Sequence, residues 1–412
     1  MVCPGRRDCR SDLCQLPGIS ALGIPRMSTL PKPLREDATH MHVLTGIRGW
    51  AALWVFLYHA WIFSDHPDLI VRLGANEFVL TPLVSLGGAG VSIFFVLSGF
   101  LLSLPFAKWQ AGLHERPETI HYLFRRVMRV FPAYYAQLLI LFLLAAWLPS
   151  QPGIDGWHDW GRHLLMLFTP PPLGVTPINP VWWTLPIEFS FYLALPFLVF
   201  LLRFERGWLI LPLALFCMWA WRHAVTIWMA DSSIQERVVA SYQLPGSLDT
   251  FSMGMLAALL YVNRARLPRW LWSPALANWL AVSGLLLMLV AVYWLFYSRG
   301  QYWSDYPIFY GWTPALALGT AAIIFAGANG GRLARALFGN PFMVFTGTIS
   351  YSLYLWHHPI LDWLHAVPVL QGLGVYRLPV MVLVALPLTM AISAASYAWI
   401  ERPLMNIGRR QS

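Results

Sequence analysis

About ten long apolar segments dominate this sequence and restrict what it can fold into, since each is near the ~20 residues that a helix needs to cross a bilayer. They lie at about 43–64, 84–106, 134–149, 182–202, 208–224, 246–263, 271–297, 310–328, 342–364 and 378–400. Charged residues make up only 11% of the chain, against about 25% in soluble domains. The sequence therefore predicts an all-α integral membrane protein, built as a single bundle of about ten transmembrane helices.

The distribution of lysine and arginine orients these segments. With the N-terminus in the cytoplasm, the inner loops and tails hold about 21 of the 28 positive residues and the outer loops about 6. Positive residues concentrate on the cytoplasmic side of membrane proteins, so we expect both termini to be cytoplasmic. The same bias accounts for the net charge of +9. No basic patch with interleaved aromatics suggests a nucleic-acid partner.

Residues 1–42 differ from the rest of the chain, because they contain Cys3, Cys9, Cys14 and several arginines but no apolar core. We expect a disordered cytoplasmic tail without a cleavable signal peptide, or an extension upstream of a true start at Met27 or Met41. No paired CxxC motif accompanies the cysteines, so no metal site is predicted. Residues 43–408 should form the membrane domain and residues 409–412 a C-terminal tail.

Arg48 and His59 lie in the first apolar segment, eleven positions apart. Eleven residues of helix come within about 20° of whole turns, so both side chains should lie on one face, about 16 Å apart along the axis. Ionisable groups inside a membrane helix are costly and usually functional. The simpler alternatives are that Arg48 anchors the helix at the headgroups and that His59 only packs between helices.

The helical rise predicts the depth of further ionisable groups. At about 1.5 Å per residue, His59, Glu188 and His357 should lie roughly 24, 21 and 22 Å from the inner face. Asp249 begins a segment near the outer boundary. We therefore expect these four side chains to gather in the outer third of the bilayer.

A second group of charges should lie at the inner face. Arg48 is about 8 Å above the inner boundary by the same rise. Arg126 and Arg129 lie where the third segment leaves the cytoplasm, on neighbouring positions of one helical turn. Guanidinium groups match phosphate oxygens in pairs, which suits a phosphorylated carrier.

Several motifs in a fixed order give the chain a resemblance to a known family. They are RGWAALWVFLYHA (Arg48, His59), GVSIFFVLSGFLLS (90–103), FRRVMRVFPAYY (Arg126, Arg129), WTLPIEFSFYL (Glu188), YQLPGSLDTFSMGMLAA (Asp249), ISYSLYLWHHPIL (Tyr351, His357) and ERPLMNIGR. From about residue 43 to 408, the chain resembles the membrane acyltransferase family 3, the polysaccharide and lipopolysaccharide O-acetylase-like proteins.

The resemblance implies ten helices with cytoplasmic ends, a cytoplasmic acyl-CoA donor and O-acylation of a sugar on the far side. It also implies that His59 is catalytic. Some members carry a soluble SGNH-type domain after the bundle. This chain stops at residue 412, so we expect that a second transfer step either needs another protein or does not occur.

The residues suggest roles within such a reaction. Arg48, Arg126 and Arg129 would bind the phosphates of acyl-CoA, which is a co-substrate rather than a bound cofactor and is expected to carry acetyl. His59 would act as a general base or take the acyl group itself. The proposed supporting groups are Glu188 or Asp249 as the carboxylate that orients the imidazole, and His357 and Tyr351 as donors to the oxyanion. The expected partners are a carbohydrate acceptor and the lipid bilayer of the inner (plasma) membrane.

The main alternative is a transporter of a polar or sugar-like substrate. Ionisable residues at mid-membrane depth and glycine-interrupted helices such as GGAGVS also occur in transporters. A transporter often carries inverted repeats, and the two halves of this sequence show no convincing repetition.

Overall fold

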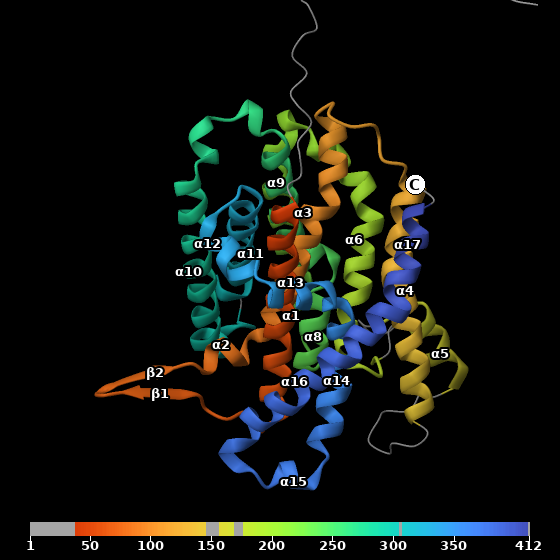
Figure 1. Ribbon diagram of the computed structural model, residues 1–412, viewed down its shortest axis with the longest axis vertical. Coiled ribbons are helices and arrows are strands. Elements are labelled where there is room, and N and C mark those ends of the chain that lie inside the picture. Colours follow the sequence, from red (N-terminus) through yellow and green to blue (C-terminus); the bar gives the residue numbers. More distant parts are fainter. Residues whose placement is uncertain (1–37, 146–155, 169–175, 305–306, 411–412) are drawn as a thin grey trace, which may run out of the picture. The chain divides into compact units, whose positions relative to one another are not determined.

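About 83% of the residues that the structure describes lie in helices (Figure 1). The computed structural model describes residues 38–145, 156–168, 176–304 and 307–410. The ten longest helices are α1 (Ala38–Ile62), α3 (Gly90–Gln110), α4 (Thr119–Ala145), α6 (Leu185–Leu198), α7 (Ile210–Trp228), α9 (Leu248–Val262), α10 (Pro274–Ser298), α11 (Pro307–Ala328), α14 (Ser350–His365) and α16 (Arg377–Ser396). Shorter helices connect or extend them: α2 (Thr81–Ser85), α5 (Gly156–Leu164), α8 (Ile234–Ser241), α12 (Arg332–Phe338), α13 (Pro341–Thr348), α15 (Pro368–Gln371) and α17 (Arg402–Arg410).

Seven helical stretches among the described residues are long and apolar enough to cross a membrane. They are Gly87–Gln110, Thr119–Leu144, Pro180–Leu202, Phe204–Trp228, Pro274–Gln301, Pro307–Ala328 and Gly374–Gly408. The chain is therefore a multi-pass membrane protein with an almost wholly helical fold. The other three expected spans correspond to α1, α9 and α14. The count of ten spans and the cytoplasmic location of both termini stay predictions.

Some boundaries differ from those that hydropathy predicts. The expected span 134–149 is the second half of α4, which already begins at Thr119 and so includes the arginines inside a helix. The expected span 342–364 is two helices, α13 and α14, which meet at Ile349. At the N-terminus α1 begins at Ala38 rather than at residue 43. The rest of the predicted tail, residues 1–37, lies outside the described residues.

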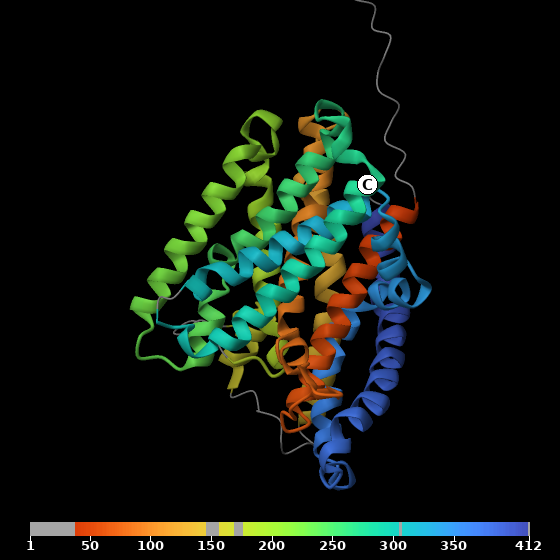
Figure 2. The ribbon, with the colours of Figure 1, turned by 90° about the vertical axis from the view of Figure 1, so that its left-hand side faces the viewer.

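The first helix packs against α3, α11, α13 and α14, and Figures 1 and 2 show α1, in red to orange, running beside these elements. Glycine permits the closest approaches. A Cβ atom at Gly46 would lie 1.6 Å from the backbone oxygen of Phe338, and one at Gly347 would lie 1.8 Å from that of Thr45. Small residues let membrane helices pack backbone against backbone, so these contacts fix the position of the helix that carries Arg48 and His59.

Between α1 and α2, a β-hairpin interrupts the helical pattern. Its strands, β1 (Ile70–Leu73) and β2 (Asn76–Val79), pair in antiparallel register from Ile70 opposite Val79 to Leu73 opposite Asn76. Gly74 makes the turn with a φ of 64°, a left-handed conformation that glycine adopts without strain. Figure 1 shows the hairpin projecting away from the helices.

One arginine that the charge count assigns to an outer loop lies elsewhere. Arg222 is inside α7 and only 1% exposed. Because Arg222 is buried inside a helix, its charge does not indicate on which side of the membrane the neighbouring loop lies. Removing it from the outer loops lowers their count of positive residues and strengthens the bias toward the inner loops.

Candidate functional site

Two neighbouring cavities open inside the helices, and they share two lining residues. The larger, of about 820 Å³, contains His59, and the smaller, of about 310 Å³, contains Arg48. Val91 of α3 and Tyr354 of α14 line both. Both volumes fall within the range of small-molecule sites. The single helix α1 therefore contributes to both cavities, with His59 in the larger and Arg48 in the smaller.

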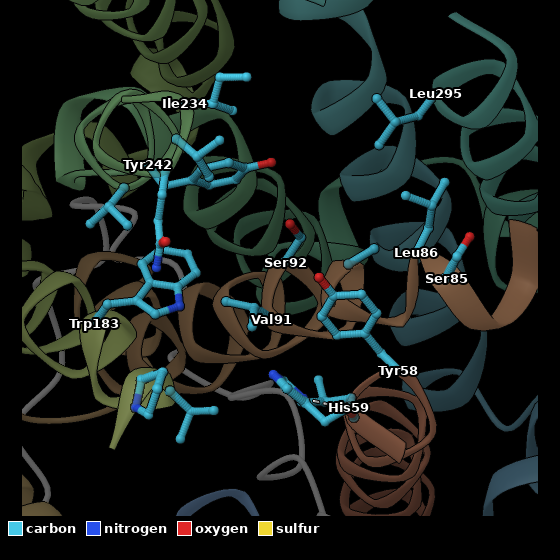
Figure 3. A pocket seen from close by; sticks show the side chains of 18 of the residues that line it. Tyr58, His59, Ser85, Leu86, Val91, Ser92, Trp183, Ile234, Tyr242 and Leu295 are labelled. Carbon is cyan, nitrogen blue, oxygen red and sulfur yellow. Dashed lines mark hydrogen bonds between the residues drawn. The ribbon is translucent and has the colours of Figure 1, made fainter. Parts of the chain in front are cut away.

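The base-like residue of the larger cavity is His59, near the end of α1. Its Nδ1 lies 3.0 Å from the carbonyl oxygen of Val55 and 3.1 Å from Nε2 of His357. Nδ1 of His357 lies 3.1 Å from the carbonyl oxygen of Leu353. Figure 3 shows the ring of His59 among Tyr58, Val91 and Ser92, all of which line this cavity.

These contacts determine which ring nitrogens carry hydrogen. A carbonyl oxygen can only accept, so Nδ1 of His357 must donate to Leu353, which leaves Nε2 of neutral His357 as an acceptor. Nδ1 of His59 faces two acceptors, the Val55 oxygen and this nitrogen, so it must also carry the hydrogen. The lone pair of His59 is therefore on Nε2. An imidazole in this tautomer can take up a proton at Nε2.

Aromatic and polar side chains form the remaining walls of the larger cavity. Helix α8 and the segment around Trp183 face the end of α10 across the cavity, as Figure 3 shows in part. The lining includes Trp183, Tyr242, Tyr302, Trp303, Glu236 and Arg299. Aromatic faces combined with a few hydrogen-bonding groups suit a ligand that is itself amphipathic and rich in hydroxyls.

The smaller cavity is strongly basic. Its lining includes four arginines, of which Arg48 comes from α1 and Arg125, Arg126 and Arg129 come from α4. The only carboxylate among its described lining residues is Glu188, whose Oε1 accepts a hydrogen bond of 2.7 Å from Ser98. Within the described part of the chain, Nε of Arg126 is buried and has no hydrogen-bond partner. An excess of guanidinium groups with an unsatisfied donor suits an anionic ligand such as a phosphate.

The structure separates the four side chains that depth alone places together. His59 and His357 are in contact, as expected from their depths, but the contact is a hydrogen bond between the two rings. Glu188 lines the arginine cavity instead. Depth along a helix predicts height, but the face of the helix decides what a side chain meets. The first turn of α6 directs Glu188 toward Ser98 of α3.

Asp249 is also away from His59, in a buried network of its own. Its Oδ2 accepts a 2.6 Å hydrogen bond from Thr313 and lies 3.8 Å from Nη2 of Arg222. The guanidinium of Arg222 also donates to the backbone oxygens of Gly246 and Phe309. Asp249 lines neither cavity. The expectation that Glu188 or Asp249 orients the imidazole of His59 is therefore corrected, since His357 occupies that position.

Tyr351 has a different place from the one expected. Its hydroxyl donates a 2.8 Å hydrogen bond to the backbone oxygen of Val130, and it lines only the arginine cavity. Sequence reasoning missed Tyr354, which lies three residues further along α14 and three residues before His357. That spacing places Tyr354 on the same helix face as both neighbours, so the pattern itself could have identified it.

Comparison with known proteins places the chain in a family. The model of the Acyl_transf_3 family, described as an acyltransferase domain, matches residues 41–398. The chain belongs to this family. The described residues that line the two cavities, Arg48 and His59 among them, all lie within the matched region. No solved structure matches the chain.

The curated relatives of this family member carry acyltransferase names. "Acyltransferase MdmB" of Streptomyces mycarofaciens is 32% identical over 162 residues, which cover 37% of this chain and 38% of the relative. A "Putative acetyltransferase" of Acidianus two-tailed virus is 25% identical, and the match covers 80% of this chain and 86% of the relative's length. A "Putative O-acetyltransferase" of Staphylococcus aureus (strain MSSA476) is 24% identical, and the match covers 90% of this chain but only 58% of the relative's length. The matches to the first and third therefore span about two fifths and three fifths of those relatives.

The network around Asp249 gives a prediction about stability. Asp249→Ala should destabilise the protein by about 3–5 kcal/mol, because the buried charge of Arg222 would lose its counter-charge. The measurement is thermal unfolding of the purified protein in detergent. Asp231→Ala, at an exposed carboxylate, is the control, and the double variant Arg222→Met/Asp249→Leu should recover part of the loss. If Asp249→Ala unfolds at the wild-type temperature, the structural role is wrong.

Proposed function

We propose that this protein is a membrane O-acyltransferase that moves an acyl group from cytoplasmic acyl-CoA to a hydroxyl of a glycan or glycoside on the opposite side of the inner membrane. One observation carries the proposal: a cavity lined by four arginines adjoins a cavity that contains a histidine with a free Nε2. The first suits the donor's phosphates and the second suits proton transfer from an acceptor. The shared wall gives the acyl group a short route between them.

The donor would bind through the smaller cavity. Arg126 and Arg129 would form paired hydrogen bonds to the phosphates, with Arg48 adding charge from α1. The buried Nε of Arg126, which has no partner among the described residues, would then be satisfied. The inner location of this cavity follows from the excess of positive residues in the loops that we assign to the cytoplasm. Acetyl is the proposed acyl group, since the matched relatives include proteins with O-acetyltransferase names.

The acceptor would bind in the larger cavity. Its aromatic rings could lie against the apolar faces of a sugar, while Glu236 and Arg299 could bond to hydroxyl groups. The same cavity contains His59, so a hydroxyl bound there would be close to the free Nε2. A carbohydrate acceptor is therefore the substrate class that we propose.

The chemical step uses His59 and the groups that are hydrogen-bonded to its ring. Nε2 of His59 takes the proton of the acceptor hydroxyl as its oxygen attacks the thioester carbonyl. The new C–O bond forms, the C–S bond breaks, and the thiolate of coenzyme A leaves and recovers the proton. The imidazolium that forms in between keeps its Nδ1–H bonded to Val55 and His357. His357 thus holds the ring in the reactive tautomer, the role that a carboxylate has in many triads.

Thioester cleavage provides a direct test of this proposal. Membranes that contain the protein should release free coenzyme A from acetyl-CoA, and His59→Ala should lower the rate by about 10²-fold or more, because the general base is removed. His114→Ala changes an exposed histidine outside both cavities and serves as the control. Wild-type turnover in membranes that contain an equal amount of the His59→Ala protein would overturn the mechanism.

The arginine cavity predicts a separate effect on donor binding. Arg126→Gln or Arg129→Gln should weaken acetyl-CoA binding by about ten- to hundredfold, since each removes charged hydrogen bonds to phosphate. Isothermal titration with coenzyme A would measure this, with Arg335→Gln at an exposed position of α12 as the matched control. An unchanged dissociation constant in both cavity variants would rule out this phosphate site.

A further inference from the structure

The β-hairpin between α1 and α2 has two chemically different faces. Side chains alternate between the two faces of a strand, so Val71 and Leu73 of β1 share one face. Phe78 of β2 lies on that same face, because it is paired with Val71 across the hairpin. Each of these three apolar residues is between 41% and 64% exposed. Arg72 and Glu77 are paired on the opposite face, where Nε of the arginine lies 2.7 Å from Oε1 of the glutamate.

Hydrogen bonds fix the base of the hairpin to the helices. The backbone nitrogen of Leu69 donates to Oγ1 of Thr81 over 2.9 Å, and that of Leu80 donates to the backbone oxygen of Leu69 over 2.7 Å. The hydroxyl of Tyr293 on α10 donates a 2.7 Å hydrogen bond to the backbone oxygen of Val79. Beyond this base the strands project away from the helices (Figure 1). The hairpin is therefore held at one level along α10.

That level lies near the end of a membrane-spanning helix. Helix α10 belongs to the stretch Pro274–Gln301, which is long and apolar enough to cross the membrane, and its Leu286 and Val290 side chains are exposed. Tyr293 lies five residues before the last residue of α10, Ser298, which is about 7.5 Å of helical rise. With 25 residues, α10 is about 37 Å long, against a hydrocarbon core of about 30 Å. The base of the hairpin therefore lies near the boundary between the acyl chains and the headgroups.

We propose that the hairpin is a membrane anchor whose apolar face, formed by Val71, Leu73 and Phe78, enters the bilayer at this boundary. Its partner is a lipid surface, because the hairpin continues from the exposed apolar side of α10. Amphipathic helices at this boundary bury their apolar face by about 5–10 Å and keep their charges in water. The hairpin separates its apolar and charged side chains in the same way, with Arg72 and Glu77 on the side that would face water.

The backbone of the hairpin limits how deep it can lie. A sheet of two strands has unpaired N–H and C=O groups along both outer edges. Such groups need water or headgroups as partners, since the hydrocarbon offers none. The boundary region satisfies both requirements, because it accepts apolar side chains on one face and still supplies hydrogen bonds to the edges.

The anchor would also fix one wall of the larger cavity. The hairpin leads directly into α2, and Ser85 of α2 lines that cavity together with Leu295 of α10 and Arg299. Contact between the hairpin and lipid would hold this wall at the membrane surface. The inference does not depend on acyl transfer, since it rests on the two faces of the hairpin and on its attachment to α10.

Site-directed spin labelling in phosphatidylcholine vesicles tests this anchor. A nitroxide label is attached to Phe78→Cys or Glu77→Cys in the full-length protein, whose four native cysteines are first changed to alanine. These neighbours lie at the same distance along the hairpin but on opposite faces. Accessibility to oxygen and to a water-soluble nickel complex should place the label at position 78 about 5–10 Å below the headgroup boundary. The label at position 77 should remain accessible to nickel.

Two further labels make the result secure. Val71→Cys, paired with Phe78 on the apolar face, should report the same depth and is available if Phe78→Cys does not fold. Leu286→Cys, on the exposed side of α10, provides the reference value for a side chain in lipid.

Three results would overturn the anchor. Equal access of nickel to positions 77 and 78 would show that the hairpin lies in water. A label at position 78 that is shielded from both oxygen and nickel would show that protein covers the apolar face. Spin–spin broadening of that label would identify the covering protein as a second copy of this chain. All of these readings come from the labels alone, so a failure of the proposed acyltransferase function would leave them unchanged.

Discussion

The hydrogen bond between His59 and His357 is the interaction on which the proposed chemistry depends. Both rings bind backbone carbonyls through Nδ1, so their tautomers follow from geometry alone. The result is a lone pair on Nε2 of His59, a residue that lines a cavity of about 820 Å³. A neutral partner differs from the carboxylate of many triads because it holds the ring without adding a negative charge. In a membrane interior this avoids the cost of burying another ion.

A second constraint comes from α1, which supplies a charged or basic group to each cavity. Arg48 faces the arginine cavity and His59 the larger one. Close backbone contacts at Gly46 and Gly347 leave little freedom for α1 to shift. The eleven-residue spacing therefore corresponds to a separation of about 16 Å along the helix axis between Arg48, which would bind the donor's phosphates in the proposed reaction, and His59, which would act as the base. Tyr354 and Val91 line both cavities.

Much of the fold could be predicted from sequence, because apolar length alone identifies membrane helices. Charges inside those helices also pointed to His59, Arg48, Arg126 and Arg129. The side chains that contact these residues were harder to predict. Asp249 and Glu188 lay at suitable depths, yet Asp249 faces Arg222 and Glu188 faces Ser98, because depth does not determine which helix a side chain meets. Tyr354 was missed because tyrosine carries no charge to mark it, although its three-residue spacing from Tyr351 and His357 could have identified it.

The most direct measurement is a structure of the protein with a non-hydrolysable acetyl-CoA analogue, determined by cryo-electron microscopy. The proposed mechanism predicts phosphates bound by Arg126 and Arg129, and an acyl end that passes Tyr354 to lie beside Nε2 of His59. Phosphates bound in the larger cavity, or an acyl end remote from His59, would contradict it.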